Sequence, residues 1–286
     1  MGQYQNHNDL LGKQVNGRAE MSGVLLGILN GLKEVEAFIP DTAPEPYSCL
    51  NISSSDLESQ LVGSSLIRDM PITKILKKVN PGAYYHFGIE NGIICLFLDS
   101  ISNEEIKLVV GIDELPISKS SSTQFWPILA YIRSTSNHVF PIGVYCGTQK
   151  PNDRNDYLKD FVIEAEQFIL NGIFINGKFY KVVLDVVCCD VPAKSFVLKI
   201  KGINGFYSCT RCKIEGEYIE NRLRYPYSEP SERTHNDYVQ RAQISHHVFS
   251  NNSCLVEISR FDIVKGFSLD NMHLVCLGVV KKLLML

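Results

Sequence analysis

Residues 179–190 read Phe-Tyr-Lys-Val-Val-Leu-Asp-Val-Val-Cys-Cys-Asp, and this stretch decides the expected fold. Apolar and β-branched residues fill most of its positions, which is typical of a strand buried on both faces of a sheet. An Asn176-Gly177 turn precedes the strand, and Val191-Pro192 opens a helix that we expect to run to about Lys201. The stretch therefore predicts a central strand followed at its carboxyl end by Asp190.

Four elements are expected before this strand. Residues 106–112 form a β-branched strand that ends in Asp113, and residues 125–132 and 139–145 read as two more short strands. Residues 155–170 have the best helical pattern in the chain, with Asn155 or Asp156 as a cap and a stop at Asn171-Gly172. The order is thus three strands, a long helix and a fourth strand.

This order predicts the fold class, an α/β protein with a ribonuclease-H-like mixed sheet. Such a sheet opens with three antiparallel strands, followed by a helix and a parallel fourth strand. Its first and fourth strands lie side by side, which would bring Asp113 and Asp190 together across the sequence. The expected domain also carries a Cys/His insertion and a poorly ordered N-terminal leader.

The two aspartates suggest metal chemistry. Carboxylate oxygens are the ligands that Mg²⁺ and Mn²⁺ prefer, and two such ions can activate a nucleophile and stabilise the leaving oxygen of a phosphodiester. The alternative for any aspartate after a strand is a turn former or a helix cap. The metal-site interpretation of Asp113 and Asp190 is favoured only because the expected order of elements places the two residues side by side.

Cys209-Thr210-Arg211-Cys212 is the second candidate site. A CxxC pair supplies two thiolates to a tetrahedral centre, which needs two further ligands. Those could come from His246 and His247, or from Asp270 and His273 at a spacing of i and i+3. We expect a structural Zn²⁺ here, with reduced core thiols and surface histidines as the alternative.

Basic residues beside these motifs are candidates for nucleic-acid contact, namely Lys150, Arg154, Lys194 and Arg211. The bland alternative is a core tryptophan, Trp126, next to a solvated loop. Residues 222–241 interleave arginines with tyrosines, as a nucleic-acid surface does, but acids dilute the pattern. Net charge is no guide to the partner: residues 1–190 carry 15 basic and 22 acidic side chains, against 13 and 9 in residues 191–286.

The remaining sequence is harder to assign. Residues 84–87 and 93–98 flank Glu90-Asn91-Gly92 and predict a β-hairpin. Helices are expected over 56–67 and 71–79, with a weaker one near 21–38. The predicted segments are a flexible leader at 1–55, a helical segment at 56–83, a ribonuclease-H-like core at 84–208, a Cys/His-containing insertion at 209–269 and the start of a last core helix at 270–286.

The composition argues against a membrane-spanning protein and against a secreted one. Of the 286 residues, 45% are hydrophobic and nine are cysteines, and no apolar run reaches the roughly 18–20 residues of a membrane span. The polar start lacks the features of a secretory signal, so we expect reduced thiols, no membrane partner, and a place in the nucleus, or in nucleus and cytoplasm.

Several motifs together carry a family resemblance over roughly residues 84–286. The blocks are Asp113-Glu114-Leu115-Pro116, Gln124-Phe125-Trp126-Pro127-Ile128, Tyr145-Cys146-Gly147, Asp190-Val191-Pro192-Ala193-Lys194, Cys209-Thr210-Arg211-Cys212 and Asp270-Asn271-Met272-His273. Together they resemble transposases of the animal transposon-derived group related to the CACTA (En/Spm) superfamily.

This resemblance implies a DDE/D enzyme that uses Mg²⁺ or Mn²⁺ to cleave DNA and transfer strands at transposon ends. Asp113 and Asp190 would be the first two catalytic acids. The third should follow the His273 region, whereas this chain ends 13 residues later in an amphipathic run. We therefore expect a C-terminally truncated and catalytically impaired transposase, with the oligomeric state left open, including a homo-oligomer.

Two other functions stay open. The chain could be a non-enzymatic relic or domesticated module that binds DNA or protein through a zinc-stabilised fold. It could also be an unrelated ribonuclease-H-like nuclease, which would need a third acid near Asp113 and Asp190 within residues 84–286.

Overall fold

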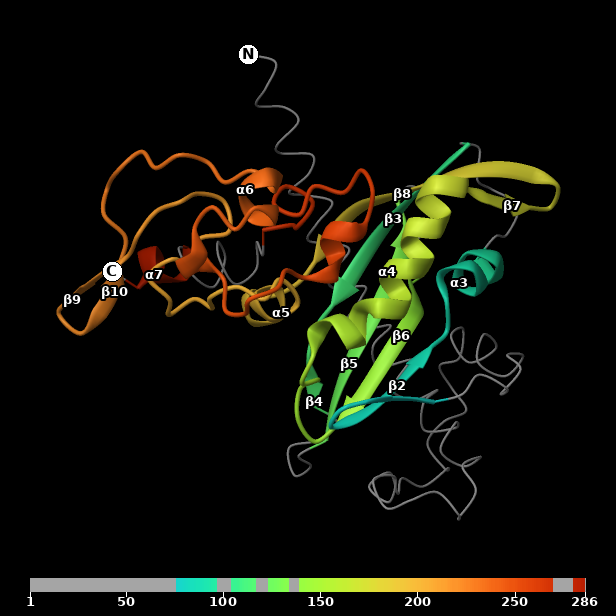
Figure 1. Ribbon diagram of the computed structural model, residues 1–286, viewed down its shortest axis with the longest axis horizontal. Coiled ribbons are helices and arrows are strands. Elements are labelled where there is room, and N and C mark those ends of the chain that lie inside the picture. The colour runs from blue at the N-terminus through green and yellow to red at the C-terminus, as the bar shows by residue number, and fades with distance from the viewer. Residues whose placement is uncertain (1–75, 97–103, 117–122, 134–138, 270–279, 286) are drawn as a thin grey trace.

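The computed structural model describes residues 76–96, 104–116, 123–133, 139–269 and 280–285. Its main feature is a mixed sheet with strand order β1-β2-β6-β5-β3-β8-β7, to which β4 adds by pairing with β5 (Figure 1). The strands are β1 (Lys77–Val79), β2 (Gly82–His86), β3 (Glu105–Ile112), β4 (Leu115–Pro116), β5 (Gln124–Ile132), β6 (Val139–Gly147), β7 (Ile173–Ile175) and β8 (Lys178–Cys188).

The centre of the sheet has the expected mixed pairing. β3 pairs antiparallel with β5, and β5 pairs antiparallel with β6. β3 pairs in parallel with β8, so the first and fourth predicted strands are neighbours. The observed bounds of β3 and β8 lie within one residue of those predicted from the sequence.

One irregularity interrupts the parallel pair. Leu108 lies opposite Leu184, but the next residue, Val109, lies opposite Val186. Asp185 is therefore the extra residue of a β-bulge, and its carboxylate forms an ion pair with Arg133 at the end of β5.

Helix α4 (Arg154–Asn171) lies across the sheet and supplies one wall of the core (Figure 1). Asp153 caps it by accepting a hydrogen bond from the Asn155 backbone N–H at 2.9 Å, so the cap is earlier than the predicted Asn155 or Asp156. At the other end Gly172 has φ 67°, a backbone region open to glycine, and its N–H bonds to the Phe168 carbonyl. The buried face is Tyr157, Leu158, Phe161, Val162, Ala165, Phe168 and Ile169.

The predicted hairpin at residues 84–98 is wrong. Residues 82–86 form β2, but Ile89–Leu96 form helix α3, and Asn91-Gly92 lies inside it. Gly92 is needed there for close packing, because a Cβ at this position would come 1.9 Å from the Phe140 ring. The Asn91 side chain donates to the Phe87 carbonyl at 2.7 Å. This bond supports the start of α3, where the sequence predicted a turn.

The helix predicted over 71–79 is also wrong at its C-terminal end. Residues 77–79 form β1, which pairs with β2 across the Asn80-Pro81 turn. Strand pairing satisfies the backbone groups that a short isolated helix would leave to water. The predicted helices at 56–67 and near 21–38, and the leader at 1–55, lie outside the described residues.

Residues 201–269, here called the Cys segment, contain little regular structure and form the second lobe in Figure 1. Its elements are β9 (Glu217–Ile219), β10 (Arg222–Arg224), α6 (His235–Val239) and the short 3₁₀ turns η3 (Ile244–His246) and η4 (Cys254–Glu257). Helix α5 (Val191–Val197), shorter than predicted, leads into it, and α7 (Lys281–Leu284) follows.

The Cys segment and the sheet share one hydrophobic core. Leu255, Ile258 and Phe267 belong to the same buried cluster as the sheet residues. Val187 at the end of β8 also forms a bridge with Phe267. Within the described part of the chain, no helix combines the length and apolar character that crossing a bilayer requires.

Candidate metal and nucleic-acid site

Asp113 and Asp190 lie at the same edge of the sheet. Gly111 on β3 pairs with Cys188 on β8, and each aspartate stands two residues beyond this pair. Because the two strands are parallel, both carboxylates leave the sheet at its carboxyl edge. The sequence prediction that these two residues come together is consistent with this pairing.

Each aspartate also has a local role. The Asp190 carboxylate accepts a 2.7 Å hydrogen bond from the Ala193 backbone N–H and caps α5. The Asp113 carboxylate accepts from the Glu114 backbone N–H at 2.8 Å. The alternative that Asp190 is a helix cap, left open by the sequence, is therefore confirmed, and any metal would share this carboxylate with the cap.

Both carboxylates act on one buried thiol, which supports their proximity. Burial raises the pKa of the Cys189 thiol, the Lys194 ammonium opposes that change, and the charges of Asp113 and Asp190 add to it. Asp113 also contributes to the raised pKa of Tyr157, whose main cause is burial. Cys189 is thus a buried core thiol whose pKa both acids help to raise.

A cleft of about 270 Å³ lies beside this edge, between α4, α5 and the loop at 248–249. Two predicted nucleic-acid residues, Lys150 and Arg154, line it. The Lys150 ammonium pairs with Glu114 at 2.8 Å and lies 4.9 Å from the centre of the Trp126 ring. Trp126 itself is completely buried, so the core reading of this residue is correct.

Arg154 is clamped between two aromatic rings. Its guanidinium carbon lies 4.6 Å from the centre of the Phe196 ring and 4.4 Å from that of Phe249. One guanidinium nitrogen donates to the Asn152 carbonyl at 3.1 Å, while Nε is buried with no hydrogen-bond partner among the described residues. The rings fix the orientation of the cation.

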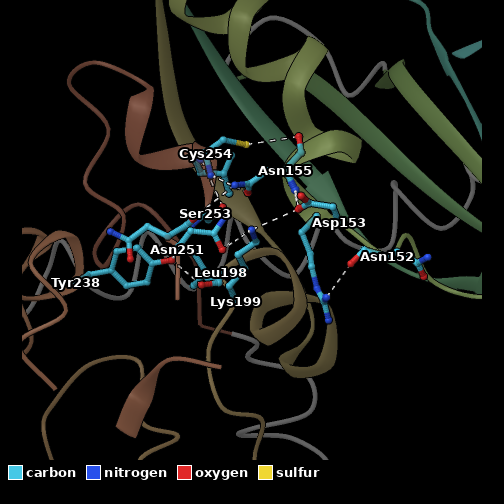
Figure 2. Close-up of polar contacts among 12 residues, drawn as sticks. Asn152, Asp153, Asn155, Leu198, Lys199, Tyr238, Asn251, Ser253 and Cys254 are labelled. Atoms are coloured by element: carbon cyan, nitrogen blue, oxygen red, sulfur yellow. Dashed lines mark hydrogen bonds and ion pairs between the residues drawn. The ribbon is translucent and has the colours of Figure 1, made fainter. Parts of the chain in front are cut away.

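Among the members of the cleft that sequence reasoning missed are Lys199 and Phe249. The Lys199 side chain is only 3% exposed and reaches Asp153 at 3.4 Å and the Asn251 side-chain oxygen at 3.2 Å (Figure 2). Its backbone has φ 55°, a left-handed conformation that is uncommon for a lysine. The only sequence signal was the end of a predicted helix, which gave no reason to single out this residue.

The other two predicted nucleic-acid residues are occupied within the fold. Lys194 is 5% exposed and donates to the Ser268 carbonyl at 2.5 Å. Arg211 donates through its two terminal nitrogens to the carbonyls of Val264 and Phe267. Both side chains therefore tie the Cys segment to itself and to α5.

Cys209 and Cys212 are free thiols whose sulfur atoms lie 3.3 Å apart. The backbone N–H groups of Arg211 and Cys212 each point at the Cys209 sulfur at 3.4 Å. A tetrahedral Zn²⁺ centre takes cysteine sulfurs as ligands. This donor set fits half of a tetrahedral zinc site.

The two histidines proposed as ligands are buried but do not join the cysteines. The His246 Nδ1 lies 2.6 Å from the Tyr207 carbonyl, and His247 packs against the ring of Tyr238. Asp270 and His273, the other proposed ligands, lie outside the described residues. Within the described ranges no cluster of three or more potential ligands is present, at the thiols or at the aspartates.

The arginine- and tyrosine-rich segment at 222–241 splits into two environments. Arg222, Arg224 and Tyr227 are exposed on or near the β9–β10 hairpin. Arg233 and Tyr238, in contrast, are each 2% exposed. The Arg233 guanidinium donates to the Cys212 carbonyl at 3.1 Å and to the Gln243 side chain at 2.5 Å. Two members of this pattern, Arg233 and Tyr238, are therefore part of the packed structure.

No protein-family model matches the chain, and no curated protein matches it.

Proposed function

We propose that this chain is a transposase-type DNA-processing protein with a ribonuclease-H-like core, whose divalent-metal site is built on Asp113 and Asp190. The observation that carries the proposal is the parallel pairing of β3 with β8, after which both strands continue to an aspartate at the same sheet edge. The family resemblance of the motifs around these residues supplies the substrate, DNA.

The residues fit Mg²⁺ or Mn²⁺ by their chemistry, since two carboxylates offer hard oxygen ligands. Such an ion, when bound, would polarise a phosphodiester and activate the attacking hydroxyl. Asp113 and Asp190 would hold it, and Lys150 would stand next to the site through its ion pair with Glu114.

The expected activity is weak, because catalytic acids of this kind act as a unit. The resemblance places a third acid after His273, and among the described residues no third ligand joins Asp113 and Asp190. The Cys209–Cys212 pair would hold a structural Zn²⁺ that shapes the Cys segment.

The test measures Mn²⁺ binding by titration calorimetry, together with cleavage of labelled DNA. We expect Mn²⁺ binding to fall in Asp113→Asn, while Asp156→Asn, an exposed carboxylate on α4, serves as the matched control. Asp190→Asn should also weaken binding, and asparagine keeps an acceptor for the α5 cap. Equal Mn²⁺ affinity in all four proteins would contradict the proposed site.

A second function has its own support, a module that binds DNA without cutting it. The observation in its favour is that the Asp190 carboxylate is already engaged by the α5 cap. In this case DNA binding would be unchanged by Asp113→Asn, and neither Mg²⁺ nor Mn²⁺ would produce cleavage.

A further inference from the structure

We propose that the cleft lined by Lys150, Arg154, Lys199, Phe196, Phe249 and Val248 is a subsite for a single phosphate of the DNA strand that enters the carboxylate pair. This inference rests on the proposed function for the identity of the strand. The evidence for the subsite itself is the charge, order and position of the cleft residues.

The charge balance of the cleft points to one anion. Three cations line it, but Lys150 pairs with Glu114 and Lys199 pairs with Asp153. The guanidinium of Arg154 is held by aromatic rings and by one carbonyl instead. One positive charge therefore remains in the cleft, and it matches one phosphate group.

The cleft is preorganised for such a ligand. The two rings on either side of Arg154 remove most of the freedom that a long side chain loses on binding. Its guanidinium donates one hydrogen bond, to the Asn152 carbonyl, which leaves terminal N–H groups of this part-exposed side chain for a phosphate oxygen.

The backbone at Lys199 fixes the position of its side chain beside the cleft. A lysine at φ 55° costs free energy that a glycine would not. The strained position directs the side chain to Asp153 at the start of α4 and to Asn251, in the network drawn in Figure 2. Neighbouring bonds hold the same junction, since Asn155 donates to the Asn252 carbonyl and accepts from the Cys254 N–H. The left-handed residue also ends α5, where the Lys199 and Ile200 N–H groups donate to the Phe196 and Ser195 carbonyls.

The cleft also lies close to the two candidate catalytic aspartates. Its wall residue Phe196 belongs to α5, the helix that Asp190 caps. Its cation Lys150 is bonded to Glu114, the residue next to Asp113. A strand held here would pass directly by both carboxylates, and the apolar walls would lie against the sugar or base of the same nucleotide.

The experiment follows binding of a short labelled single-stranded DNA by fluorescence anisotropy over a series of salt concentrations. Arg154→Ala should weaken binding by about threefold to tenfold, as expected for one charge-assisted contact. The slope of log affinity against log salt should fall by about 0.7, the value for one phosphate on a single strand. Arg154→Lys keeps the charge and should keep the slope.

One control variant and one further test variant separate binding from folding. Lys178→Ala removes a lysine that also lies over an aromatic ring, that of Tyr180, but at the far end of β8, and should leave affinity and slope unchanged. Lys199→Gly places the residue that φ 55° favours and should weaken binding while the fold is retained. Far-ultraviolet circular dichroism checks the fold of each variant.

The source of the phosphate is distinguished by competition. Inorganic phosphate at matched ionic strength should compete weakly, since it lacks the sugar and base, whereas unlabelled DNA should compete fully. An unchanged affinity and slope in Arg154→Ala would overturn the subsite, and full competition by inorganic phosphate would assign the site to free phosphate instead of a DNA strand. If Arg154 governs DNA binding but Asp113→Asn leaves Mn²⁺ binding intact, the proposed function fails and the subsite stands.

Discussion

The sheet with α4 and the Cys segment share a hydrophobic core, but different contacts fix the backbone of each region. The sheet and α4 are stabilised by strand pairing and by the packing of buried apolar side chains, including the seven buried residues of α4. In the Cys segment, buried cations and hydroxyls bond to backbone carbonyls, as Arg211 and Arg233 do. Periodic sequence encodes the first kind of structure, whereas individual side chains encode the second.

This difference predicts an asymmetric dependence between the two regions. The Cys segment packs on α4, for instance through Ser259, whose N–H and hydroxyl both donate to Glu166 at 2.6 Å. Damage to the sheet should therefore unfold both regions. Damage to the thiol pair should loosen the Cys segment alone.

Phe161→Ala is expected to have the largest effect. The ring is fully buried on α4, and its removal leaves a cavity between helix and sheet, which costs about 3–5 kcal/mol of unfolding free energy. Urea denaturation followed by the fluorescence of Trp126, the single tryptophan, measures the change. Lys159→Ala, at an exposed neighbouring position, is the control, and an equal loss in both variants would refute the packing argument.

Cys209→Ser should act locally. If the thiol pair holds zinc, this variant or a chelator should raise hydrogen exchange across the Cys segment and leave β3, β8 and α4 protected. Cys188→Ser, at a thiol on the sheet, is the matched control for the loss of a sulfur. Metal analysis should find one zinc per chain before treatment. Simultaneous loss of protection in both regions would show that they are not separable.

The smallest effect is expected at Glu164, which connects α4 to the β2–α3 turn. Burial favours its neutral form, but hydrogen bonds from His86 and the Ile89 and Glu90 N–H groups outweigh this and lower its pKa. A lowered pKa in the folded state stabilises the protein above the ordinary glutamate pKa. That stabilisation is lost as the pH falls through the folded value.

Glu164→Gln should therefore cost about 1–3 kcal/mol at neutral pH and make the unfolding free energy less dependent on pH in the acid range. Urea denaturation at a series of pH values measures both effects. Glu90→Gln, an exposed acid on α3, is the control. An acid dependence as steep as that of the unmodified chain would assign it to other groups.

Much of the sheet could be predicted because its signals are local. The β-branched run at 106–112 and the apolar run at 179–189 give strands whose ends match the structure within a residue. Helix α4 is equally local, and its cap was displaced only because Asp153, Asn155 and Asp156 can all accept hydrogen bonds at a helix start.

The failures arise where distant residues decide the conformation. Asn91-Gly92 is a turn signal on its own, and only the Phe140 ring packed against it explains why glycine is required within a helix. The cleft, too, could be predicted only from contacts between residues that are distant in the sequence. Lys199 and Phe249 are 50 residues apart in sequence and meet only because the Cys segment folds back onto α5.

The bulge at Asp185 has a consequence for the spacing of the two acids. Before it, partners on β3 and β8 differ by 76 in residue number, and after it by 77. Without the shift, Asp113 would continue opposite Cys189 and not opposite Asp190. Deleting Asp185 would remove the extra residue and leave the acids aligned, whereas flattening the bulge at constant length would separate them. Strand β8 can therefore lose one residue at the bulge and still keep Asp190 opposite Asp113. The bulge lies between the start of β8, where it pairs with β7, and Asp190 beyond its end.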